Sequence, residues 1–243
     1  MNPRALCVAV VVLGLAGAAQ ADFFDPFNYP NGGVTVVSGG LWQLWPGPVV
    51  DAIVTGGVVN ITDNPSAPGS SPDVVRYTNN ILSSSGKALF AFDFLASGGG
   101  DTLPQVNLIS SSWAYNDGGI LVFFYEPSDG SRIDVWDGLT AYPTASAPYT
   151  ADVWHHFEAT LVQQGGTVHW NTYLDGTRFG TFDTTLTAPL GLNVVELGTW
   201  TSSAAGGTVL VDNVVAVFPE PATLSLLGLG DLALLRRRAR RTA

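Results

Sequence analysis

The feature that most constrains this fold is a series of short runs in which apolar and polar residues alternate. Between Asp22 and Phe218, turn-forming residues interrupt the chain about every 8 to 12 residues, and no stretch shows the roughly 3.6-residue period of an amphipathic helix. In residues 87–95 every second side chain is apolar, namely Ala88, Phe90, Phe92 and Phe94. Such a pattern predicts strands that pack one face against a core.

Other segments predict strands of the same kind. Residues 120–125 are continuously apolar, as in a central strand buried on both faces, and residues 131–136 return after a Pro127–Gly130 turn. With about a dozen strands and no crossover helix, we expect an all-β, antiparallel two-sheet β-sandwich, with residues 22–218 as one domain. The remaining predicted strands are residues 34–37, 58–62, 74–78, 106–110, 194–199 and 208–217.

The first 21 residues have the three-part organisation of a secretory signal peptide. Arg4 precedes an apolar run over Ala5–Leu15, and small residues end at Ala21, where we expect signal peptidase to cut. Cys7 is the only cysteine and lies within this segment. The exported domain is therefore predicted to have no disulfide, thiolate metal ligand or cysteine nucleophile.

The last 25 residues, 219–243, combine a proline break, a short apolar run and a basic end. Residues 222–235 would form a helix about 21 Å long, which is short for a bilayer core of roughly 30 Å, and Asp231 weakens it further. The cluster of Arg236, Arg237, Arg238, Arg240 and Arg241 would stay on the cytoplasmic side as a stop to translocation.

This tail, with Pro219, Glu220 and Pro221 at its start, resembles the PEP-CTERM sorting signal. The resemblance implies recognition by an exosortase, transient tethering through the short transmembrane helix, and delivery to the cell surface or the extracellular polysaccharide matrix. A plain membrane anchor or an amphipathic tail is the alternative interpretation.

The charge of the predicted domain excludes nucleic acid as a partner. Residues 22–218 hold 18 acidic and 4 basic residues, so the domain is more acidic than the whole chain, whose net charge is −10. Such a surface repels phosphate backbones and anionic membranes. We therefore expect contact with membrane only through the C-terminal tail.

Two neighbouring segments resemble the concanavalin A-like and laminin-G-like jelly rolls. They are Trp154-His155-His156-Phe157 and Tyr173-Leu174-Asp175-Gly176, and the segments 24–27 and 211–215 are similar to the first and last strands of that superfamily. The resemblance implies a β-sandwich with a concave sheet, neighbouring first and last strands and, in many relatives, carbohydrate or protein binding.

No catalytic pattern accompanies this predicted fold. Glucanases of similar fold carry a Glu-x-Asp-x-x-Glu strand, whereas Glu126, Glu158 and Glu196 are isolated from one another in this sequence. His155 and His156 would point to opposite faces of one strand, so they are not expected to bind one metal ion together. We therefore predict a protein without enzymatic activity.

Candidate binding residues lie in one strand and at the two ends of the domain. Asp134, Trp136 and Asp137 form an aromatic and acidic cluster that suits sugar binding, although the same residues fit a strand end entering a turn. Asp25 and Asp212 are candidate ligands of a structural calcium ion if the terminal strands pair; ordinary edge acids are the alternative. Trp42, Trp45, Trp113, Trp136 and Trp200 are candidate sugar-stacking residues, whereas Trp154 and Trp170 fit the pattern of core residues.

The sequence thus predicts an exported surface or matrix protein with a non-catalytic jelly-roll module that binds carbohydrate or matrix polymer. Two alternatives stay open at this point. One is a glycan-cleaving enzyme with unrecognised catalytic carboxylates, and the other is a purely structural component that assembles with copies of itself.

Overall fold

The alternating pattern forms strands throughout the part of the chain that can be described. The computed structural model describes residues 23–45, 51–62, 73–77, 87–97, 103–110, 119–125, 130–137, 143–164, 167–185, 192–200 and 207–217. The predicted signal peptide (1–21) and the predicted sorting tail (219–243) lie outside these residues. Within the described ranges, no helix has the length and apolar character needed to cross a membrane.

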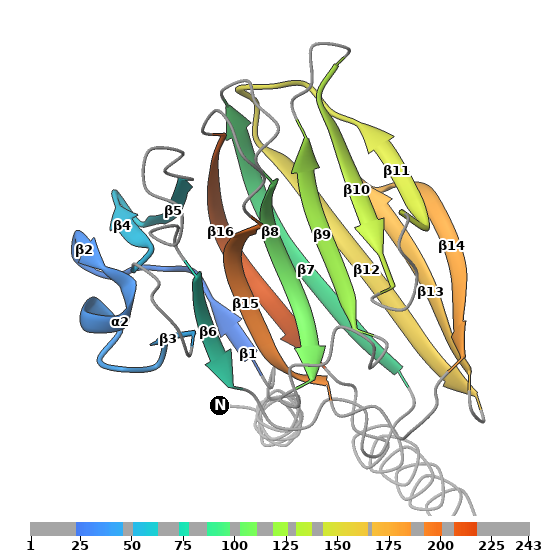
Figure 1. The fold of residues 1–243 in the computed structure, drawn as a ribbon, viewed down its shortest axis with the longest axis horizontal. Helices are drawn as coiled ribbons and strands as arrows, with labels where there is room; N and C mark the ends of the chain where they lie inside the picture. Colours follow the sequence, from blue (N-terminus) through green and yellow to red (C-terminus); the bar gives the residue numbers. More distant parts are fainter. Residues whose placement is uncertain are drawn as a thin grey trace, which may run out of the picture.

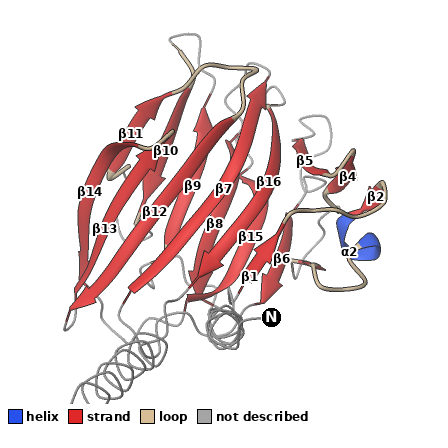
Figure 2. Ribbon diagram, turned by 180° about the vertical axis from the view of Figure 1, so that it is seen from behind, coloured by secondary structure: helices blue, strands red, loops and turns tan. Residues whose placement is uncertain are grey.

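The strands form two antiparallel sheets that pack face to face, as Figures 1 and 2 show. This confirms the predicted all-β, two-sheet sandwich. The larger, nine-stranded sheet has the order β14 (Thr177–Thr185), β13 (Thr167–Leu174), β12 (His155–Gln164), β7 (Lys87–Ser97), β16 (Thr208–Val217), β5 (Val58–Thr62), β4 (Ile53–Thr55) and β2 (Gly32–Gly33), and β1 (Phe23–Asp25) also pairs with β16. The seven-stranded sheet has the order β11 (Ala145–Pro148), β10 (Arg132–Trp136), β9 (Ile120–Tyr125), β8 (Leu103–Ser110), β15 (Leu192–Trp200), β6 (Asp73–Tyr77) and β3 (Gln43–Leu44).

The core lies between the sheets and is centred on the phenylalanines of β7. Phe90, Phe92 and Phe94 are all 0% exposed, as the alternation predicts. Phe92 stacks on Phe157 of the neighbouring β12 with ring centroids 5.0 Å apart, and Phe94 reaches Phe124 of the opposite sheet at 4.7 Å. Aromatic contacts of this kind add to the apolar area that each ring buries.

Register and turns agree with the sequence in several places. β1 pairs with β16, which confirms that the first and last strands are neighbours. The Asp175-Gly176 turn joins β13 to β14 with φ values of 51° and 74°, the left-handed conformation that a tight hairpin needs. β9 is buried on both faces along nearly its whole length, as its continuous apolar run predicts.

The prediction of a strand at residues 34–37 is wrong, because Val34–Val37 forms one helical turn, α2. Asp51, distant in sequence, accepts hydrogen bonds from the Thr35 backbone N–H at 3.2 Å and from the Thr35 hydroxyl at 2.6 Å. Gly39 and Gly40 then adopt positive φ and end the turn. The carboxylate of Asp51, from a distant segment, thus provides an acceptor for a backbone N–H of the first turn. This contact favours the helical turn over the strand that the valines would otherwise favour.

The core prediction holds for one tryptophan and fails for another. Trp170 is 0% exposed between the sheets, whereas Trp154 is 45% exposed. Trp154 lies in the turn before β12 begins at His155, so the alternation of that strand does not yet apply to it. The prediction of Trp42 as a sugar-stacking residue is also wrong, because Trp42 is 0% exposed in the core.

Candidate functional site

The alternation of β10 places Arg132, Asp134 and Trp136 on the outer face of the seven-stranded sheet. The intervening Ile133 and Val135 are 0% exposed in the core between the sheets. Two of the predicted binding residues, Asp134 and Trp136, therefore share one face. Asp137, the third, lies directly after β10 and is buried at 5% exposure.

Asp134 acts as a buried anchor on this face. Its side chain is 3% exposed, and both of its carboxylate oxygens accept from Arg132 Nε at 3.2 Å. The Ser146 hydroxyl, on neighbouring β11, donates to Asp134 Oδ1 at 2.6 Å. Arg132 in turn lies over the Tyr125 ring with its guanidinium carbon 4.5 Å from the ring centroid, in cation–π contact. Asp134 and Tyr125 together fix the plane of the guanidinium.

Tyr125 stays protonated in this arrangement at neutral pH. Burial raises the pKa of its hydroxyl, the charge of Asp134 raises it further, and the charge of Arg132 opposes the change. Its role on this face is therefore that of an aromatic surface with a neutral hydroxyl.

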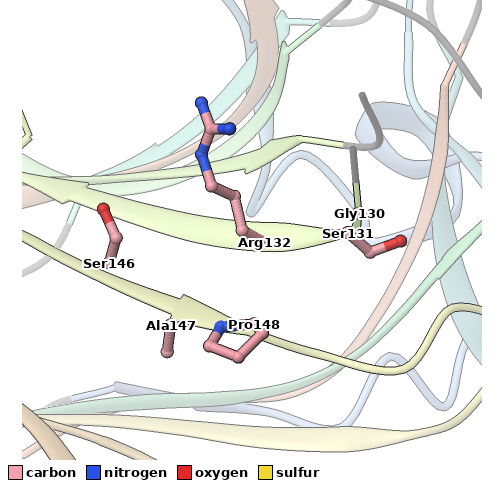
Figure 3. Close-up of a pocket in the computed structure, with 6 residues that line it drawn as sticks. All are labelled: Gly130, Ser131, Arg132, Ser146, Ala147 and Pro148. Carbon is pink, nitrogen blue, oxygen red and sulfur yellow. The ribbon is translucent and has the colours of Figure 1, made fainter. Parts of the chain in front are cut away.

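An open pocket of about 260 Å³ lies beside this group, between β10 and β11. It is lined by Gly130, Ser131, Arg132, Ser146, Ala147 and Pro148. In Figure 3 the side chains of Arg132 and Ser146 extend to the same side of their strands, and that of Ala147 extends to the other. The pocket thus offers guanidinium donors and a hydroxyl on one side.

A second polar group lies further across the same face. Glu196 of β15 is 0% exposed, and its two oxygens accept from Gln105 Nε2 and Asn107 Nδ2 of β8 at 2.9 Å each. In the sequence Glu196 is isolated from other carboxylates, and its hydrogen-bond partners lie 91 and 89 residues away in the chain. A signal was present in the sequence of β8, where the amides Gln105 and Asn107 occupy alternating positions of a mainly apolar strand and so indicate a polar group on one face.

Two buried polar atoms on this face, Gln105 Oε1 and Trp136 Nε1, have no hydrogen-bond partner among the residues that the structure describes. Trp136 packs edge to face on Phe123 at 5.4 Å, and Gln105 lies opposite Phe123 in the register of β8 and β9. A buried polar atom without a partner is uncommon and calls for a bound water or ligand group. Both atoms lie on residues that neighbour Phe123 on this face.

The aromatic candidates fall into distinct places. Trp136 and Trp45 are partly buried against the apolar side chains of this outer face. Trp113 and the side chain of Trp200 lie outside the described part of the structure, so their assignments stay predictions.

Asp25 occupies the other edge of the sandwich, and its carboxylate is already saturated with hydrogen bonds. Oδ2 accepts from the Tyr29 hydroxyl at 2.7 Å, the Trp42 indole at 2.8 Å and Arg76 at 2.7 Å, and Oδ1 accepts from the Phe27 N–H at 2.9 Å. Burial and the hydrogen bond to Asp25 raise the pKa of Tyr29 to about 12. The carboxylate therefore serves as an acceptor for four donors.

This arrangement does not fit the calcium site predicted at Asp25 and Asp212. The two residues are close enough for the charge of Asp25 to act on Asp212. However, the oxygens of Asp25 already accept from four donors, and one of these is the positively charged Arg76 guanidinium, with which a calcium ion would have to compete. Among the described side chains, no group of three His, Asp or Glu residues is arranged to hold a metal ion.

Asp212 faces a like charge directly across the sheet, on Asp93 of β7. Burial raises the pKa of Asp212, and the charges of Asp93 and Asp25 raise it further, against the hydrogen bond from the Asn213 N–H. A carboxyl whose pKa is raised on folding contributes stability at low pH and loses it as the pH rises through the folded pKa.

We expect Asp212→Asn to stabilise the protein at pH 7 by about 0.2–1 kcal/mol, the range for one cross-strand pair. The amide oxygen still accepts from Asn213, while the repulsion of Asp93 is removed. At pH 3 the difference should disappear, since the wild-type carboxyl is then protonated. Thermal unfolding at both pH values measures this, with Asp152→Asn in an exposed turn as the control; a pH-independent gain would contradict the explanation.

Each of the three histidines of the chain is paired with an aspartate on the nine-stranded sheet. His155 contacts Asp175 at 2.7 Å, whereas His156 contacts Asp93 at 2.6 Å. Burial alone would raise the pKa of Asp175, but hydrogen bonds from His156 and His155 and the charges of both imidazoles hold it below its ordinary value. The two imidazole rings thus contact different aspartates, while the His156 backbone N–H also donates to Asp175.

Comparison with known proteins shows a similarity of fold. No family model and no curated protein matches the sequence. The endo-1,3-beta-glucanase from Streptomyces sioyaensis is similar in structure, with a TM-score of 0.59 and 13% identity, over 81% of this chain and 96% of that one. The carbohydrate recognition domain of Emp47p gives a TM-score of 0.54 and 12% identity, over 83% of this chain and 97% of that one.

A sialidase gives a TM-score of 0.54 at 13% identity over 81% of this chain, but this chain spans only 19% of the sialidase. At these identities the likeness concerns the fold alone. The chain therefore shares the jelly-roll fold of these proteins, in agreement with the two-sheet sandwich that its strand pattern predicts.

Proposed function

We propose that this chain is an exported, non-catalytic carbohydrate-binding module whose ligand contacts the outer face of the seven-stranded sheet around β9, β10 and β11. The observation that carries the proposal is the fixed guanidinium of Arg132, held by Asp134 over Tyr125 beside an open pocket. Sugar sites combine aromatic surfaces with a few oriented polar groups, and this face supplies both.

The unpartnered atoms support the same location. Trp136 Nε1 is a donor and Gln105 Oε1 is an acceptor, and sugar hydroxyls satisfy either kind of atom. The glucanase and the carbohydrate recognition domain named above are similar in fold, and their names make glycans a natural class of ligand to test.

The spacing of carboxylates on this face favours binding over hydrolysis. Among the described side chains, Asp134 of β10 and Glu196 of β15 face outward, with β9 and β8 between them. Three strand spacings separate them by about 14 Å. Retaining glycosidases hold their two carboxyls about 5–5.5 Å apart and inverting enzymes about 6.5–9.5 Å apart, so this pair suits neither mechanism.

Export and sorting complete the proposal. The signal peptide at residues 1–21 and the tail at residues 219–243 direct the module through the inner membrane, with exosortase cleavage near Pro219–Pro221 releasing it to the cell surface or the extracellular polysaccharide matrix. The resemblance of the tail to PEP-CTERM signals supports this part, and a shift of the mature mass after exosortase deletion tests it.

We expect Trp136→Ala to weaken glycan binding by more than tenfold, as truncation of a central aromatic contact usually does. Trp136→Phe keeps the packing on Phe123 but removes the N–H, so its loss should be smaller. Trp154→Ala removes an exposed tryptophan of the turn before β12 and should leave binding unchanged.

The measurement is binding of the purified protein to a glycan array, with and without a calcium chelator, followed by mass spectrometry of the bound glycans. Binding without cleavage and with the expected variant order supports the proposal. Glycan cleavage would favour the enzymatic alternative, and self-association without any glycan binding would favour the structural one.

A further inference from the structure

The guanidinium of Arg132 has N–H donors at the pocket that Asp134 does not engage. Its Nε is engaged by Asp134, and its face is covered by Tyr125. No described residue accepts a hydrogen bond from its two terminal amino groups, although the side chain is only 39% exposed. The guanidinium is therefore oriented in advance, with an unused fork of donors.

Other basic residues of the described sheets are placed differently. Arg76 forms an ion pair with Asp25 at 2.7 Å, and Arg178 is exposed on β14, at the edge of the other sheet. Of these three arginines, Arg132 is the one that lines the pocket beside β11.

The fork of a guanidinium matches the two oxygens of a carboxylate, and such bidentate pairs are stronger and more specific than bonds to neutral hydroxyls. Ser146 adds a complementary group, because its hydroxyl proton is already donated to Asp134. Its oxygen is therefore left to accept a hydrogen bond from a ligand. A donor fork beside an acceptor hydroxyl fits a ligand that carries a carboxylate and a hydroxyl together.

We propose that this pocket recognises the carboxylate of a uronic acid residue, with Arg132 binding the carboxylate and Ser146 accepting from a neighbouring sugar hydroxyl. This inference rests on the proposed function and makes the ligand an acidic polysaccharide. With 18 acidic and 4 basic residues, residues 22–218 repel a polyanion over long range at low salt, but at about 0.15 M salt the screening length is only about 8 Å. Contact within the pocket then decides the affinity.

The test compares short uronic acid oligosaccharides with their methyl esters. We would titrate the protein at 0.15 M salt with galacturonate, glucuronate and mannuronate trisaccharides, each in free-acid and esterified form. Esterification keeps the shape of the sugar and removes the charge. We expect at least one free acid to bind about tenfold or more tightly than its ester, as a charge-assisted bond allows.

Variants assign the preference to Arg132. Arg132→Met should abolish the difference in affinity between acid and ester, and Arg132→Lys should retain only part of that difference because the fork is lost. Arg178→Met makes the same charge change on the other sheet and should behave as wild type. Far-UV circular dichroism and melting temperature verify that each variant is folded.

Several outcomes would overturn the inference. Equal affinity for every acid and its ester would do so while leaving a neutral glycan-binding role intact, as would a preference that persists in folded Arg132→Met. A sulfated neutral oligosaccharide that binds as tightly as the uronates would overturn the assignment to a carboxylate. Absence of binding to any glycan, acidic or neutral, would overturn the proposed function as well.

Discussion

Replacement of Asp25 by alanine is expected to cost about 3–5 kcal/mol of unfolding free energy, the range for breaking a buried ion pair by removing one partner. Asp25 is 1% exposed, and its side chain accepts from four donors that span residues 27–76. Alanine deprives the Arg76 guanidinium of this carboxylate and the Trp42 indole N–H of this acceptor. Because small domains are stable by only about 5–15 kcal/mol, the variant should unfold at much lower urea concentration.

Asp25→Asn separates charge from hydrogen bonding. The amide keeps one acceptor oxygen but cannot neutralise Arg76, so an intermediate loss is expected. The double variant Asp25→Ala/Arg76→Met should lose less stability than the sum of the losses of the two single variants, because both substitutions remove the same interaction. Asp183→Ala, an exposed aspartate of β14, should change stability by less than about 0.5 kcal/mol. If Asp25→Ala stayed within that same range, the cluster would not be what fixes β1 and Trp42 to the sandwich.

The strands that the sequence predicts best are those whose pattern is local. The alternation in β7 and the apolar run of β9 are written in consecutive residues, and burial of alternate or all side chains follows directly. The Asp175-Gly176 turn is equally local, because only a few residue types adopt its positive φ values without strain.

Features that depend on contacts between distant segments were missed. The turn α2 depends on Asp51, which accepts a hydrogen bond from the backbone N–H of Thr35, 16 residues away. Without knowledge of that contact, a valine-rich run predicts a strand. Trp42 looked available for a ligand because its acceptor, Asp25, lies 17 residues upstream and requires β1 to be folded against β16. Neither contact can be predicted from the local periodicity of the sequence.

The candidate site was predicted only in part for the same reason. Asp134 and Trp136 were found because they are neighbours on one strand with a suggestive composition. The sequence does not indicate that the Asp134 carboxylate accepts hydrogen bonds from Arg132 and Ser146 and is therefore not available to a ligand. The register of β10 and β11 brings Ser146 beside Asp134. The register of β8 and β15 likewise creates the buried group around Glu196.

Phe92→Ala, the second large effect, is expected to reduce stability by about 3–5 kcal/mol because it opens a cavity at the centre of the sandwich. Phe92 is 0% exposed, stacks on Phe157 at 5.0 Å and meets Phe124 of the opposite sheet at 6.2 Å. The ring thus joins both sheets, and neighbours fixed in two rigid layers collapse only partly into the space it leaves.

Two matched variants make the result interpretable. Phe92→Leu retains most of the volume and should cost clearly less than alanine, since the loss grows with the size of the cavity. Leu89→Ala lies on the outer face of the same strand, is only partly buried and should cost about 1 kcal/mol or less. Urea unfolding of the three variants gives the comparison. Similar losses for Phe92→Ala and Leu89→Ala would mean that the two faces of β7 are equally buried, which contradicts a core confined between the sheets.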